Sequence, residues 1–157
     1  SERYYQKMGR THKRITDWAH QMILQLRRWL PNRPIVVVAD SSYAALDLLH
    51  FCQSMAKPVT FITRLRLDAA LYEPAPTRLP GQMGRPRLKG QRLPTLKELL
   101  DRPDTRWFRA SVAWYDDDTR TVELSSHTAL WYHTGKSPVS IRWVMRGNVI
   151  SCGKEMR

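Results

Sequence analysis

The stretch RPIVVVADSSYAALDLL, residues 33–49, decides the predicted fold. Residues 35–39 form a short, apolar, β-branched run, which is typical of a strand buried on both faces and therefore central in a sheet. Polar residues beginning with Asp40 end this run. Apolar residues then return at helical spacing over about residues 43–56. The stretch therefore predicts a strand followed by a helix, with Asp40 between them.

The flanking segments extend this pattern. Apolar residues recur at intervals of three and four over residues 15–30, which predicts an amphipathic helix that Thr11 caps and the proline-containing segment 31–34 ends. Residues 59–63 predict a second strand. Helix, strand, helix and strand in this order predict an α/β sheet with parallel strands. The apolar stripe expected on the first long helix comprises Ile15, Trp18, Ala19, Met22, Ile23, Leu26 and Trp29 or Leu30.

The second half of the chain has a different character. Residues 73–94 mix proline, glycine and basic residues, which predicts an extended basic loop. A short helix is expected at residues 96–100. The last third alternates apolar and polar residues, which favours β structure. The predicted strands cover residues 107–115, 121–124, 128–133 and 139–145.

Composition narrows the class of protein. The chain has 157 residues, room for one ordinary domain, and a formal net charge of +12 with a pI near 10.3. This charge favours a polyanionic partner, with nucleic acid first among the candidates, although solubility alone also explains basic domains. Two cysteines, and no apolar run long enough to cross a membrane, indicate a reducing, cytoplasmic location.

Asp40 is the strongest candidate for chemistry. The carboxyl ends of parallel strands are where α/β proteins gather ligands, and Asp40 directly follows the first predicted strand. A carboxylate there can bind Mg²⁺, which prefers oxygen ligands. The alternative is that Asp40 only caps the helix that follows, which is a common role of Asp.

Four segments resemble bacterial insertion-sequence DDE transposases. Residues 33–49 resemble the strand and helix around the second catalytic Asp of this family, and residues 58–72 resemble the strand and loop that follow. The stretch GQMGRPRLKGQRLP, residues 81–94, is similar to the family's basic linker. PVSIRWV, residues 138–144, resembles the strand that closes its β-rich insertion. The resemblance covers about residues 1–146.

This resemblance implies part of a ribonuclease H-like fold with a β-rich insertion, in the α/β class. In such enzymes two Asp and one Glu hold two divalent ions, Mg²⁺ or Mn²⁺, and cleave or transfer DNA strands. Asp40 corresponds to the second Asp, and it is therefore the predicted catalytic and metal-binding residue. DNA, as transposon ends and target, is the implied partner, together with a homodimer of the complete protein.

The resemblance also divides the chain. Residues 1–72 correspond to part of the ribonuclease H-like core, 73–106 to the basic linker and a short helix, and 107–146 to the insertion. Residues 147–157 depart from the family pattern, so Glu155 is not taken as the third acid. The first Asp is expected before Ser1 and the Glu after Arg157, which indicates a transposase fragment that is inactive alone.

Six basic residues are candidate DNA contacts. Arg64 and Arg66 follow the second strand at alternate positions, so they either face DNA phosphates together or are merely exposed arginines at a sheet edge. The others lie in the basic loop, which we expect to bind phosphates without reading sequence. They are Arg85, Arg87, Lys89 and Arg92.

Other residues give weaker indications of a functional site. Residues 116–118 are three consecutive Asp, expected in a hairpin turn rather than a metal site. His127 and His133 share a strand face without a third ligand. Related transposases use an aromatic residue of the insertion to hold a flipped base, for which Trp131 is one candidate, but a core role is the stronger expectation.

Two other functions stay open. One is a non-catalytic basic DNA-binding module in which Asp40 only caps a helix. The other is a doubly wound nucleotide-binding domain, which is disfavoured because no glycine-rich phosphate loop follows the first strand.

Overall fold

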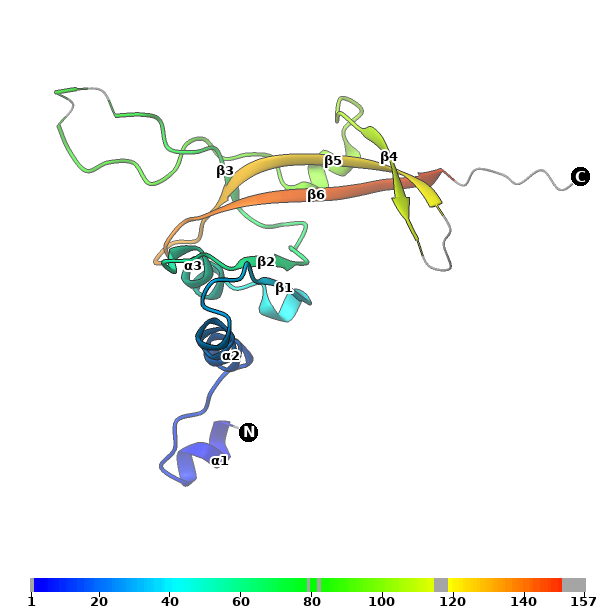
Figure 1. Ribbon diagram of the computed structural model, residues 1–157. Helices are drawn as coiled ribbons and strands as arrows, with labels where there is room; N and C mark the ends of the chain where they lie inside the picture. Colours follow the sequence, from blue (N-terminus) through cyan, green and yellow to red (C-terminus); the bar gives the residue numbers. More distant parts are fainter. Residues whose placement is uncertain (1, 79, 82, 115–118, 151–157) are drawn as a thin grey trace, which may run out of the picture. The chain divides into compact units, whose positions relative to one another are not determined.

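The computed structural model describes residues 2–78, 80–81, 83–114 and 119–150, and it has a mixed α/β fold (Figure 1). The chain divides into two compact units. The first unit comprises Ser1–Arg66 and His133–Val139, and the second comprises Leu67–Tyr132 and Ser140–Arg157. The predicted turn at residues 116–118 and Glu155 lie outside the described residues.

The elements follow the expected order with three short additions: an N-terminal helix, a 3₁₀ helix after the first strand and a two-residue strand before the basic loop. They are α1 (Glu2–Lys7), α2 (Ile15–Trp29), β1 (Val36–Ala39), the 3₁₀ helix η1 (Ser41–Tyr43), α3 (Leu46–Ser54), β2 (Thr60–Thr63), β3 (Leu71–Tyr72), α4 (Leu96–Asp101), β4 (Phe108–Ala113), β5 (Thr119–Trp131) and β6 (Val139–Ile150).

The first unit is built on the predicted parallel strand pair. β1 and β2 pair in parallel, with Val36 opposite Thr60 and Ala39 opposite Thr63. The connection through α3 allows this direction, because parallel strands need a crossover. Helices α2 and α3 pack on the sheet around a small core (Figure 1). Its buried residues are Ile23, Leu48, Cys52 and Val59.

The expectation that β1 is buried on both faces is wrong for the described residues. Val37 packs against the core, whereas Val36 is 59% exposed and Val38 is 75% exposed. Ile62 of the neighbouring strand is also exposed. Both helices cover one face of the sheet, and no other described element of the first unit covers the opposite face, so every second valine faces outward.

Helix α2 also differs in its start and its buried side. Thr11 does not cap it: the helix begins at Ile15, and the Asp17 carboxylate accepts a hydrogen bond from the Arg14 N–H at 2.8 Å. The helix buries Ile23, but Trp18 and Trp29 are more than half exposed. The apolar residues of α2 span a wider part of the helix surface than α3 and the sheet cover. The apolar side chains at the edge of that surface are therefore exposed.

The second unit contains an antiparallel sheet arranged on β5. β4 pairs with its first half, β3 pairs with its last two residues, and β6 also pairs with β5. The two strands predicted at residues 121–124 and 128–133 are one strand. The polar residues between them stay extended because Ser125 is buried in the sheet and Ser126 accepts a hydrogen bond from Arg142.

Candidate metal and DNA-binding residues

Asp40 directly follows β1, and its main chain is bound to the neighbouring strand. The Thr63 hydroxyl donates a hydrogen bond to the Asp40 carbonyl oxygen at 2.5 Å. Because Thr63 is the last residue of β2, this bond links the carboxyl ends of the two parallel strands. The Asp40 residue is exposed, so its carboxylate is open to a ligand at this edge.

The Asp40 side chain also makes a cap. Its Oδ1 accepts a hydrogen bond from the Ser42 N–H at 2.8 Å and begins the 3₁₀ helix η1. The next helix, α3, begins after Ala45, which makes no side-chain cap. Asp40 therefore has a structural role in a short turn, and this role leaves the carboxylate exposed.

No further acids gather beside Asp40 in the part of the chain that the structure describes. That part contains no group of three or more His, Cys, Asp or Glu side chains that could hold a metal ion. Asp47 of α3 forms an ion pair with Lys136 instead. His127 lies in β5, which ends at Trp131, so His133 lies beyond the strand and the two do not share a strand face as predicted. Asp40 is thus one oxygen ligand rather than a complete metal site.

Arg64 and Arg66 follow β2 directly and are both exposed. They belong to the same compact unit as Asp40, because the first unit extends to Arg66. Two guanidinium groups therefore follow the strand whose last residue, Thr63, is bonded to Asp40.

The basic loop, residues 73–94, is closed by a neck at residues 71–73 and 90–93. Glu73 and Gln91 bond through their backbones at 2.9 Å, and the Gly90 N–H donates to the Glu73 carbonyl at 2.8 Å. The Leu93 N–H donates to the Leu71 carbonyl at 2.9 Å. Tyr72 and Arg92 form an antiparallel bridge at the same place. The two arms of the loop extend from this neck (Figure 1).

Glycine at position 90 is required by this neck. A Cβ atom there would lie 2.5 Å from the Pro74 carbonyl oxygen and 2.9 Å from the Glu73 Cβ. The first of these neighbours is backbone and cannot move aside without opening the neck.

The four residues of the basic loop that are predicted to contact DNA have different surroundings. Arg85 and Arg87 are exposed in the outer part, where they line a hollow with Arg78. Arg92 lies in the neck. The Lys89 ammonium lies over two aromatic rings, 3.6 Å from the ring centroid of Tyr72 and 4.5 Å from that of Tyr132.

Comparison of the sequence with models of known protein families identifies the family of this chain. A family model described as DDE superfamily endonuclease matches residues 1–138, which is most of the chain. The chain belongs to this endonuclease family. No curated protein and no solved structure matches it. In the described part of this endonuclease chain, no helix is both long enough and apolar enough to cross a membrane.

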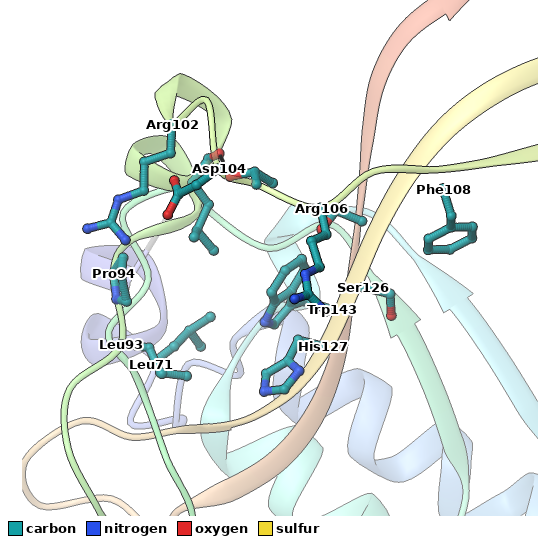
Figure 2. Close-up of a pocket in the computed structure, with 13 residues that line it drawn as sticks. Leu71, Leu93, Pro94, Arg102, Asp104, Arg106, Phe108, Ser126, His127 and Trp143 are labelled. Carbon is teal, nitrogen blue, oxygen red and sulfur yellow. Dashed lines mark hydrogen bonds between the residues drawn. The ribbon is translucent and has the colours of Figure 1, made fainter.

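The second unit of the endonuclease chain contains a cavity of about 420 Å³ (Figure 2). One wall is apolar, with Leu71, Leu93 and Pro94, and the Trp143 and His127 side chains lie side by side on another. Their ring centroids are 6.4 Å apart. The remaining lining residues include Leu99, Arg102, Asp104, Thr105, Arg106, Phe108, Ser125 and Ser126. The cavity therefore combines apolar and aromatic surfaces with two guanidinium groups and one carboxylate, that of Asp104.

The sequence did not indicate which aromatic residues the structure brings to the cavity and to the neck of the basic loop. Trp131 does not line the cavity, whereas Trp143 does, and Trp143 is 9% exposed. Tyr72 and Tyr132 come together because residues 71 and 72 pair with residues 131 and 130 of β5. No local pattern indicates this register, because the paired strands are about sixty residues apart in the chain.

Proposed function

We propose that this chain is part of the DNA-cleaving domain of a transposase, with Asp40 as one of its metal-binding carboxylates. The observation that carries the proposal is the position of Asp40 in a chain of the DDE superfamily endonuclease family. It is exposed at the carboxyl end of β1, next to the end of the parallel strand β2. Ligands of α/β proteins gather at this kind of edge.

A ribonuclease H-like core with a β-rich insertion is the architecture that we propose for the complete domain. Two features support it. β1 and β2 are parallel and are joined through α3, as in an α/β core. The β structure of the second unit follows after the basic loop.

The described residues fit a divalent metal only in part. Asp40 supplies a hard oxygen ligand suited to Mg²⁺ or Mn²⁺, but a lone carboxylate leaves Mg²⁺ hydrated and weakly held. When bound by a full set of carboxylates, two such ions clamp the attacking and leaving oxygens of a phosphodiester. Cleavage therefore needs acids besides those of the described part of the chain.

DNA is the substrate that we propose for this domain. The net charge of +12 attracts a polyanion, and exposed arginines supply phosphate contacts. They follow β2 (Arg64 and Arg66) and occupy the outer basic loop (Arg85 and Arg87). Contacts of this kind fix the protein on the DNA backbone and do not read sequence.

The cavity of the second unit suits an unpaired base. The exposed His127 ring can stack on a base, with the largely buried Trp143 ring beside it, and Arg102 and Arg106 can pair with a phosphate. His127 is exposed, so His127→Ala is the suitable variant. It should weaken binding of a duplex with one unpaired base and leave binding of a fully paired duplex unchanged.

The metal role of Asp40 is tested with paramagnetic Mn²⁺. Titration of Mn²⁺ should broaden the amide NMR signals of Ser41, Ser42 and Arg64 in the wild type, and the broadening should disappear in Asp40→Asn. The Asn side chain keeps an oxygen that accepts the Ser42 N–H, so this variant removes charge without removing the cap. Equal broadening in both proteins would overturn the assignment of Asp40.

The second candidate is a non-catalytic basic DNA-binding module. The Asp40 cap on Ser42 and the lack of an acid cluster in the described residues favour it. It predicts DNA binding that does not depend on Mg²⁺ and no loss of function in Asp40→Asn. The Mn²⁺ titration distinguishes the two candidates, because only the first requires a metal at Asp40.

A further inference from the structure

Lys89 has partners that set it apart from the other basic residues of the loop. Its ammonium lies 3.6 Å from the ring centroid of Tyr72 and 4.5 Å from that of Tyr132. The two rings meet edge to face with centroids 6.1 Å apart. A cation near the faces of two aromatic rings is attracted by both. Lys89 is also only partly exposed, unlike Arg85 and Arg87.

This contact lies at the neck of the basic loop. Lys89 precedes Gly90, whose N–H donates to the Glu73 carbonyl, and Tyr72 precedes Glu73. Tyr132 belongs to the segment after β5, and its N–H donates to the Ala70 carbonyl at 3.4 Å. The lysine therefore links the returning arm of the loop to the outgoing arm and to the sheet.

We propose that Lys89 is a positioning residue for DNA binding: it holds the neck closed through Tyr72 and Tyr132, and Arg85 and Arg87 contact the phosphates. A lysine that turned toward a phosphate would weaken its contact with the two rings, so the two roles compete for one ammonium group. A closed neck shortens the free segment that carries the arginines and lowers the entropy lost when DNA orders it. The inference rests on the proposed DNA binding.

The decisive comparison uses variants that separate charge from contact. Tyr132→Leu breaks half of the ring contact and keeps every basic residue, whereas Lys89→Gln removes the charge and the contact together. Lys89→Arg keeps a cation that stacks on aromatic rings. Each variant is measured by DNA affinity over a salt series and by hydrogen exchange of the Gly90 and Glu73 amides without DNA.

A positioning role predicts one pattern of results. Lys89→Gln and Tyr132→Leu should each weaken DNA binding by about two- to tenfold, the range expected for loss of a cation–π contact. The double variant should be no weaker than the weaker single variant, because both changes break the same contact. Exchange of the neck amides should speed up in both, and Lys89→Arg should behave as the wild type in both measurements.

Two results would overturn the inference. The first is weaker binding in Lys89→Gln together with wild-type binding in Tyr132→Leu although exchange of the neck amides speeds up in Tyr132→Leu, because the neck then opens without affecting DNA binding and Lys89 contacts phosphate directly. The second is unchanged amide exchange in both variants, because Lys89 then does not hold the neck. A wild type that binds no DNA would overturn the proposed function itself, and the exchange data would still report separately on the neck.

Discussion

Arg27 of α2 donates a hydrogen bond from Nη2 to the carbonyl oxygen of Lys57, 3.0 Å away. Its Nη1 donates to the carbonyl oxygen of Arg33 at 2.9 Å. Lys57 lies in the segment that leads into β2, and Arg33 lies in the segment that leads into β1. One guanidinium therefore holds both connections that enter the parallel strand pair, at the opposite end of the sheet from Asp40.

Replacing Arg27 should destabilise the first unit. Arg27→Met leaves the carbonyls of Arg33 and Lys57 without their charged donor, and hydrogen bonds to charged groups are worth more than neutral ones. We expect the free energy of unfolding to fall by about 2–3 kcal/mol, measured by urea denaturation. The matched control is Arg28→Met, an exposed neighbour, which should change it by less than about 0.5 kcal/mol. Equal effects would remove Arg27 from this role.

The two faces of β1 should respond differently to the same substitution. Val37→Thr places a hydroxyl against the core and should cost about 1–3 kcal/mol of stability. Val38→Thr changes a side chain that is 75% exposed and should cost less than about 0.5 kcal/mol. Because exposed apolar strands promote association, Val38→Thr combined with Ile62→Thr should also reduce aggregation in light scattering. Unchanged aggregation would show that this face does not drive association.

These faces show what local sequence determines and what it does not. The apolar run at residues 35–39 predicted a strand, and the parallel pairing of β1 with β2 is confirmed. Burial depends on what covers the strand, so Val38 was placed wrongly: packing is set by other elements, not by the run itself. The position of Asp40 after β1 was also predictable, because Asp40 directly follows the apolar run that indicates the strand. The contact of Lys89 with Tyr72 and Tyr132 was not, since it depends on strand register between distant segments.

The outer arginines of the basic loop should determine part of the salt dependence of DNA binding. Each neutralised phosphate contributes about −0.9 to the slope of log affinity against log salt concentration. Arg85→Gln combined with Arg87→Gln should flatten that slope by up to about two units. The control removes the same charge elsewhere, with Arg28→Gln and Arg33→Gln, and should alter the slope less. If both pairs of variants give the same slope, general charge rather than the loop binds DNA.

Cys52 should be unreactive in the folded protein. It is 1% exposed in the core of the first unit, and burial raises the pKa of its thiol from 9.0 to about 11. The thiolate is the nucleophile, so alkylation by iodoacetamide at pH 8 should require unfolding. Folding favours the protonated thiol, so its contribution to stability should be lost as the pH rises from about 9 to about 11. Cys152→Ser leaves Cys52 as the only cysteine, and rapid alkylation of this native variant would contradict the burial of Cys52.

The roles of Asp40 can be separated by two substitutions. Asp40→Ala removes the acceptor for the Ser42 N–H and should cost about 1 kcal/mol of stability, as loss of a cap does. Asp40→Asn keeps an acceptor oxygen and should leave the stability nearly unchanged. Both variants remove the negative charge that a divalent metal needs, so both should abolish metal binding.

DNA cleavage should depend on the negative charge of Asp40 and not on its hydrogen bond to the Ser42 N–H. This chain alone should not cleave DNA at any Mg²⁺ or Mn²⁺ concentration, because two-metal phosphoryl transfer needs several converging carboxylates and the described residues hold no such group. In an active transposase that contains this chain, Asp40→Asn and Asp40→Ala should both reduce strand cleavage to background in a gel assay and leave DNA affinity intact. Cleavage that survives in Asp40→Asn but is lost in Asp40→Ala would assign Asp40 to the η1 cap alone. Metal-dependent nicking by the chain alone would instead show that its acids suffice.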